Sequence, residues 1–278
     1  MTIGFLALFV SLGAFVAGLL GSLTGLGGGL IIVPLLTLVF GVDIRYAIGA
    51  SLVSIIATSS GAAAAYVREG FTNVRVGILL EVATTIGAMA GAYMSGLFPT
   101  RALAILFAVL LLVTAYRSAK PRLEHAVLTT PDAWATRLRL DSWYPTAAGP
   151  QFYSVRNVPA GFALMFLAGI LSALLGIGSG IIKVLAMDQL MQLPFKVSTT
   201  TSNFMIGVTA AASAGVYLHR GYLDPTLAFP VMLGVLIGAL LGARLLGRTN
   251  AARLRQVFTV VVVIMAAEML YRGARGTI

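Results

Sequence analysis

The chain has 278 residues, of which 59% are hydrophobic and only 10% are charged, and its mean hydropathy is +0.96. Because a soluble domain carries about 25% charged residues, this composition excludes a water-soluble globular protein and indicates an integral membrane protein. The formal net charge of +10 arises from basic residues in loops between apolar runs, so it indicates membrane topology and excludes nucleic-acid binding.

Ten apolar runs follow one another along the chain as predicted membrane segments. They lie at about 3–20, 26–40, 46–67, 74–98, 102–116, 160–175, 177–193, 197–218, 226–246 and 254–270. A spanning helix needs about 20 apolar residues, so the second and seventh runs are short. The first run begins almost at Met1, and we interpret it as a spanning helix and not as a removed signal peptide.

The stretch 118–157 differs from the rest because it contains charged residues, four prolines and both tryptophans. Trp134, Trp143 and Tyr144 are residue types that favour the membrane interface. We therefore divide the chain into a first transmembrane repeat (1–117), a cytoplasmic or interfacial loop (118–157) and a second transmembrane repeat (158–278).

The two halves are an internal duplication. A shift of 151 residues places Gly25 on Gly176 and Ser51 on Ser202, and the halves then align without a gap over about 75 positions. Five segments per half is an odd number, so the second half enters the membrane from the opposite side. The expected fold class is all-α, a polytopic bundle of two inverted repeats with short or broken second and seventh segments.

The distribution of basic residues predicts the orientation. One side of the bundle carries Arg45, Arg101, Arg220, Arg272 and Arg275, and Lys183 lies inside a segment, which leaves 13 of the 19 Lys and Arg on the other side. Because cytoplasmic loops are enriched in basic residues, we expect both termini outside and the central loop in the cytoplasm.

Two stretches of small residues interrupt the apolar pattern at equivalent positions, each just before a short segment. They are Gly25, Gly27, Gly28 and Gly29 in the first half and Gly176, Gly178, Ser179 and Gly180 in the second. Glycine costs about 1 kcal/mol relative to alanine inside a helix, so several together predict a broken helix. A helix that restarts there presents free N–H groups, which suits an anion. The alternative is close helix packing through small residues.

Polar side chains near these breaks are predicted anion ligands. Lys183 lies three residues after Gly180 inside an apolar segment, and an intramembrane lysine is costly and therefore indicates function. Its alternative role is to extend its ammonium to the membrane surface. The following helix of each half begins with hydroxyl and amide groups, from which we select Ser51, Ser202 and Asn203. Their alternative role is hydrogen bonding between helices.

Glu81 lies in the fourth segment, about two turns from its start. A carboxyl group inside a membrane can take up and release protons, so Glu81 is the predicted proton-coupling residue. The alternative is a position near the interface, with an ion pair to Arg75.

The residues that surround both breaks resemble a known family. The stretch from Gly18 to Pro34 is similar to the first signature of the TauE/SafE sulfite exporters, and the stretch from Gly169 to Val184 is similar to the second. Ser179 replaces a glycine of that second signature, and Leu185 stands where the first repeat has Pro34. The resemblance implies an inner-membrane permease that exports sulfite or organosulfur anions such as sulfoacetate.

We therefore expect a secondary transporter of a small anion that works by alternating access about a site near the membrane midplane. The expected partners are the anion and the lipid bilayer, with the chain acting as a monomer or homodimer. Cysteine is absent and the two histidines form no cluster, so we expect no metal, no cofactor and no enzymatic activity. An anion channel and an assembly or receptor subunit remain alternatives.

Overall fold

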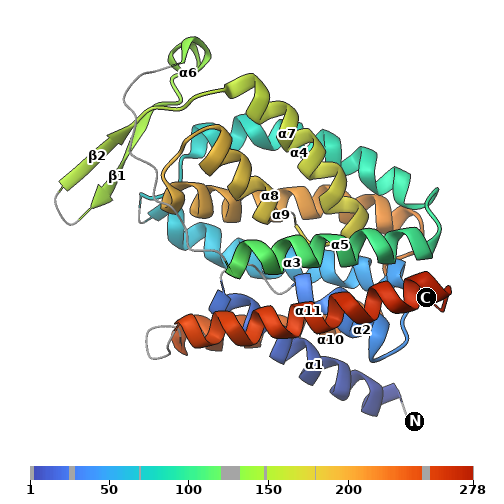
Figure 1. The fold of residues 1–278 in the computed structure, drawn as a ribbon. Coiled ribbons are helices and arrows are strands. Elements are labelled where there is room, and N and C mark those ends of the chain that lie inside the picture. The colour runs from blue at the N-terminus through green and yellow to red at the C-terminus, as the bar shows by residue number, and fades with distance from the viewer. Residues whose placement is uncertain are drawn as a thin grey trace.

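The computed structural model describes residues 3–24, 29–68, 70–119, 132–146, 149–178, 180–245 and 251–277. Most of them are helical. The helices are α1 (Ile3–Thr24), α2 (Gly29–Leu38), α3 (Ile44–Arg68), α4 (Val74–Ser95), α5 (Thr100–Ala119), α6 (Ala133–Arg137), α7 (Val158–Leu175), α8 (Gly180–Leu185), the π-helix η1 (Ala186–Leu190), α9 (Phe195–His219), α10 (Pro225–Leu245) and α11 (Ala251–Arg275). The long helices lie side by side as one bundle (Figure 1).

Five helices of the described ranges are long and apolar enough to cross a membrane. They contain the spans Val74–Ser95, Thr100–Arg117, Val158–Leu175, Pro225–Gly242 and Gln256–Arg275. Helices α3 and α9 are 25 residues long but carry many small polar residues. Their polar side chains, such as Ser54, Ser198 and Thr209, are buried, so these two helices lie against other helices along their polar faces. The chain is therefore a polytopic helical membrane protein.

The second and seventh predicted segments form short helices. Helix α2 has 10 residues, which extend about 15 Å, half the thickness of a hydrocarbon core. Helix α8 has six residues and continues into the five-residue π-helix η1. Both helices are therefore too short to span a membrane as regular helices.

Close helix contacts recur at the 151-residue offset found in the sequence. Gly18 of α1 lies against the backbone of Val235 in α10, and Gly169 of α7 lies against the backbone of Thr84 in α4. A Cβ atom at either glycine would clash with the facing carbonyl oxygen. The first helix of each half is thus packed along the fourth helix of the other half.

Helices α3 and α9 run antiparallel to each other. Gly49, near the start of α3, lies against the carbonyl oxygen of Tyr222, just after α9 ends. Further along α3, Ser59 contacts Gly207 in the middle of α9. These two helices occupy equivalent places in the two halves of the sequence.

Loops that the sequence assigned to the same side of the membrane meet at the same end of the bundle. At the first end, Arg45 donates a hydrogen bond to the Phe98 carbonyl over 2.9 Å, and its guanidinium lies over the Tyr222 ring. At the other end, Asn73 donates to the Leu140 carbonyl over 2.9 Å. Figure 1 shows both labelled termini at one end and the hairpin at the opposite end.

Part of the central region has a small structure of its own. Strands β1 (Ser142–Thr146) and β2 (Gly149–Tyr153) form an antiparallel hairpin next to α6. Tyr153 and Val155 are buried in an apolar cluster with Met187 and Val76. The hairpin therefore shares an apolar cluster with the start of α4 and with η1. The sequence predicted a loop here and gave no sign of a hairpin.

Candidate functional site

Glycine conformation breaks the helix between α7 and α8. Gly176 ends α7 with a φ of +63°, and Gly178 follows with a φ of +68°. Side chains rarely adopt this left-handed region, and a Cβ at Gly178 would lie 2.8 Å from the Ile206 side chain. Both glycines are needed for the chain to leave α7 and restart as α8 at Gly180. Of the predicted break residues, Gly25, Gly27, Gly28 and Ser179 lie outside the described residues.

The predicted serine ligands are hydrogen bonded to the backbone at the two breaks. The Ser51 hydroxyl donates to the Gly176 carbonyl over 2.7 Å and lies 3.4 Å from that of Gly29. The Ser202 hydroxyl donates to the Gly180 carbonyl over 3.3 Å. The contacts of Ser51 with Gly29 and of Ser202 with Gly180 are equivalent in the two halves, so each hydroxyl fixes the start of a short helix.

The two breaks lie close together in space. The Ile55 side chain of α3 lies beside both Gly29 and Gly178.

Asn203, the predicted amide ligand, comes one residue after Ser202 and is partly exposed. Among the described residues, its amide has no hydrogen-bond partner.

Lys183 and Glu81, which the sequence proposed for separate roles, form a buried ion pair. The Lys183 Nζ atom lies 3.4 Å from the Glu81 Oε2 atom and donates to the Thr209 hydroxyl over 2.5 Å. The Lys183 side chain is fully buried, and that of Glu81 is 10% exposed. Thr209 in turn donates to Glu81 Oε1 over 2.6 Å. The three side chains come from α8, α4 and α9 and form a closed triangle.

Two further threonines complete the surroundings of the carboxylate. Thr84 donates to Glu81 Oε2 over 2.8 Å, and Thr85 donates to Glu81 Oε1 over 3.3 Å. With Lys183 and Thr209, four donors surround the two oxygens, which suits an ionised carboxylate. Sequence reasoning missed all three threonines. Thr84 and Thr85 stand three and four positions after Glu81, a spacing that brings side chains together on one face of a helix.

The interfacial alternative for Glu81 does not match its surroundings. Arg75 donates to the Arg139 carbonyl over 3.0 Å, near the hairpin. Among the described residues, the cation paired with Glu81 is Lys183. Lys183 is fully buried, so it does not extend its ammonium to the membrane surface.

The ion pair has no equivalent in the other half of the duplication. The residues at the matching positions are Ile32 for Lys183 and Met232 for Glu81. Ile32 is fully buried in the apolar core. Thr58, which matches Thr209, donates to backbone carbonyls of its own helix. The charge at the breaks is therefore asymmetric.

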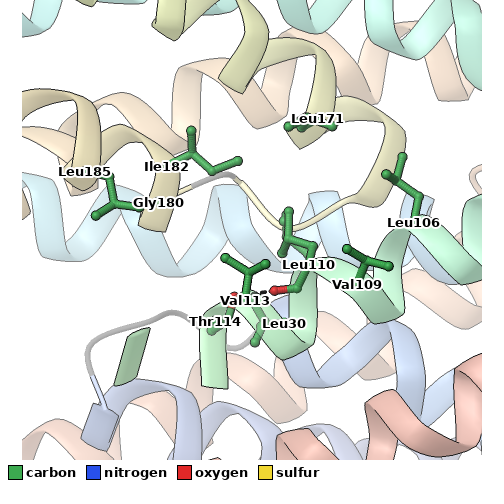
Figure 2. Close-up of a pocket in the computed structure, with 11 residues that line it drawn as sticks. Leu30, Leu106, Val109, Leu110, Val113, Thr114, Leu171, Gly180, Ile182 and Leu185 are labelled. Atoms are coloured by element: carbon green, nitrogen blue, oxygen red, sulfur yellow. Dashed lines mark hydrogen bonds between the residues drawn. The ribbon is translucent and has the colours of Figure 1, made fainter. Parts of the chain in front are cut away.

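A cavity of about 250 Å³ lies next to the two short helices (Figure 2). Its lining is Leu30, Leu106, Val109, Leu110, Val113, Thr114, Leu171, Ile177, Gly180, Ile182 and Leu185. The hydroxyl of Thr114, the one polar side chain of this set, donates to the Leu110 carbonyl over 2.8 Å. The lining is therefore apolar apart from Thr114, and Lys183 is not part of it.

In the parts of the chain that the structure describes, no three His, Cys, Asp or Glu side chains gather as a metal site requires. The apolar helices and the buried ion pair define a polytopic membrane protein with an ionisable group in its interior. Such groups in membrane helices mark ion and substrate pathways, which is the character of a transporter.

The family model described as "Sulfite exporter TauE/SafE" matches residues 10–269, and the chain belongs to this family. "Probable membrane transporter protein YunE" of Bacillus subtilis is 29% identical over 268 residues, covering 93% of this chain and 95% of the relative. "Probable membrane transporter protein YdhB" of the same organism is 27% identical over 231 residues, covering 83% and 86%. A "Probable membrane transporter protein" of Xylella fastidiosa is 26% identical and covers 98% of both chains. No solved structure matches. The chain is a membrane transporter and not an enzyme.

Proposed function

We propose that the chain is a secondary transporter that exports a small anion such as sulfite, sulfoacetate or another organosulfonate. The observation that carries this proposal is Lys183, a fully buried ammonium within one helical turn of a glycine break. Its burial is costly, and a positive charge in an apolar bundle is suited to binding an anion. The family name points to the same substrate class.

In the proposed site, the anion lies between the starts of α2 and α8. The N–H groups at Gly25, Gly27, Gly28 and Gly29 and at Gly178, Ser179 and Gly180 bind it from both halves. The N–H of Gly176 is not among them, because it donates to the Ser172 carbonyl over 2.8 Å. Lys183 supplies the charge, and Ser51, Ser202 and Asn203 supply further donors. Hydroxyl groups rotate freely about their C–O bonds, so each serine can turn from the backbone carbonyl that it contacts toward an anion.

Transport then proceeds by alternating access between two inverted repeats. The antiparallel arrangement of α3 and α9 supports this proposal, because inversion reverses the direction of equivalent helices. The contacts that recur at the 151-residue offset support it as well. One repeat rocks against the other about the breaks, and Glu81 is the residue that couples the movement to protons.

The same proposal places the transporter in the inner membrane, with both termini outside and the central loop in the cytoplasm. It rests on the 13 basic residues of that side and on the meeting of its loops at one end of the bundle. The protein acts there as a monomer or homodimer. Cysteine-accessibility labelling of Ser118→Cys and Thr277→Cys variants in intact cells and open membranes tests this orientation.

The experiment for the function is uptake of labelled sulfite and sulfoacetate by proteoliposomes. We expect the wild-type protein to exchange external label against unlabelled anion inside, and Lys183→Met to lose this activity. Lys196→Met is the matched control, because Lys196 lies over the Phe71 ring at the start of α9. Equal flux in wild type and Lys183→Met contradicts the proposed site. Flux without counterflow or uphill movement favours an anion channel over a carrier.

A further inference from the structure

The Lys183–Glu81 pair joins the two repeats. Glu81 stands on α4 in the first repeat, and Lys183 and Thr209 stand on α8 and α9 in the second. In the proposed mechanism, a rocking movement of one repeat against the other stretches or breaks this link. The pair is therefore a contact of one conformational state, and whatever separates the two charges favours the other state.

The Lys183 ammonium can donate one further hydrogen bond. A lysine has three N–H donors, and those of Lys183 reach the Glu81 carboxylate and the Thr209 hydroxyl. Among the described residues, no acceptor is found for the third donor. Glu81 thus occupies the position beside Lys183 where a substrate anion would bind. One N–H donor of the ammonium stays available.

Charge balance determines how the site responds when a monovalent anion reaches Lys183. With Glu81 ionised, two negative groups share one ammonium, and the buried site has an uncompensated charge, which is unfavourable. One proton from water, added to a Glu81 oxygen, restores neutrality. The exposed fractions of the two side chains fit protonation at Glu81, because the Glu81 side chain is 10% exposed whereas Lys183 is fully buried. The protonated carboxyl still accepts hydrogen bonds from Thr84 and Thr85.

Few other groups can take part in this titration. Helix α7, which lies against α4, carries no titratable residue, and Lys183 is the charged residue of α8. On α9 the titratable residues are Lys196, Tyr217 and His219, and the nearest of them is eight positions from Thr209, about 12 Å along the helix.

The remaining groups on the packed elements are distant along their helices. On α4 they are Arg75 and Tyr93, six and twelve positions from Glu81. On η1, Asp188 stands five positions from Lys183. Glu81 is therefore the group whose protonation changes when an anion binds beside Lys183.

We propose that Glu81 is a built-in counter-ion that a substrate anion displaces from Lys183, and that one proton joins Glu81 for each anion bound. This inference rests on the proposed function and specifies its coupling. Anion and proton bind together, so a monovalent anion crosses without net charge. For a monovalent anion the direction of transport is then set by the combined gradients of anion and proton, and the membrane potential has no influence on it.

The test is calorimetric titration of the purified transporter with sulfoacetate, whose charge does not change near neutral pH. Titrations in two buffers with different ionisation enthalpies give the number of protons taken up per anion. By linkage we expect about one proton per anion for the wild type and about zero for Glu81→Gln. Glu268→Gln is the matched control, because it removes the carboxylate of an exposed ion pair with Arg272. It should retain the wild-type value.

A second measurement uses thermal stability. Sulfoacetate should raise the Tm of Glu81→Gln more than that of the wild type, because the anion replaces the missing carboxylate beside Lys183. Binding to the wild type with no proton uptake would overturn the inference while the proposed function stands. If neither sulfite nor sulfoacetate binds or crosses, the proposed function itself fails. If Glu81→Gln does not fold, the wild-type proton count still decides.

Discussion

The buried ion pair allows a quantitative prediction through a double-mutant cycle. The variants are Lys183→Met, Glu81→Gln and the combination of both. Removing one partner of a buried pair costs about 3–5 kcal/mol, because the other charge is left without compensation. Removing both leaves no buried charge, and replacement by groups of similar volume is often close to neutral. The two single costs should therefore not add.

The surroundings of each charge set the order of the two single variants. In Lys183→Met, the carboxylate keeps three threonine donors and slight exposure, so we expect about 3 kcal/mol. In Glu81→Gln, a fully buried ammonium keeps only the Thr209 oxygen and the amide oxygen, so we expect about 5 kcal/mol. The double variant should lose no more than about 2 kcal/mol, which makes the coupling energy larger than about 3 kcal/mol.

The assay is reversible unfolding in mixed detergent micelles, followed by circular dichroism. The control cycle uses Arg272→Met and Glu268→Gln, a pair whose side chains are 38% and 44% exposed. We expect a coupling below about 1 kcal/mol there, because solvent screens exposed pairs. If the Lys183 and Glu81 costs add within about 0.5 kcal/mol, the pair does not form in the membrane protein and the counter-ion inference falls with it.

Three other predictions concern the breaks and the loop region, and all are read out by thermal or chemical denaturation. Gly178→Ala should cost about 1–3 kcal/mol, because φ is +68° and the new Cβ would lie 2.8 Å from Ile206, whereas Gly215→Ala, with open space around it, should stabilise by up to about 1 kcal/mol. Equal effects of the two changes would contradict the strained turn. Asn73→Ala should cost about 1–2 kcal/mol, because it removes the N-cap of α4 and the hydrogen-bond donor to the Tyr153 hydroxyl. Burial raises the pKa of Tyr153 from 10.0 to about 12, so its contribution to stability is complete below pH 10.0 and is lost as the pH rises toward 12. Tyr153→Phe should remove that alkaline loss.

The helical part of the fold could be predicted because each segment carries its own signal. Apolar runs of membrane length are local features, and so are the glycines before α2 and α8. The hairpin had no such signal. Strands β1 and β2 have five residues each, and each contains a proline, Pro145 or Pro150. Proline removes a ladder donor, so the pattern favours a loop over a strand. Burial of Tyr153 against α4 and η1 stabilises the hairpin, and that contact is not local in the sequence.

The candidate site, like the fold, has parts that could be predicted from the sequence and parts that could not. Lys183 and Glu81 could each be found, because a charge inside an apolar run stands out. Their pairing could not, since they are 102 positions apart and meet only through the packing of α4 and α8 on α9. The hydroxyl of Ser51 shows the reverse case. Its place at the break could be predicted from the duplication, but its hydrogen bond to the Gly176 carbonyl depends on how the two halves meet.

The asymmetry of the duplication has a consequence for stoichiometry. The halves supply two equivalent helix starts, at Gly29 and Gly180, and the Ile55 side chain lies beside Gly29 and beside Gly178, two residues before the second start. A second lysine at the position of Ile32 would place two ammonium groups near one another in an apolar interior, where like charges repel strongly. Met232 would also provide that second lysine with no carboxylate. A single ammonium with a single counter-ion avoids this conflict, and under the proposed mechanism it limits each transport cycle to one anion and one proton per chain.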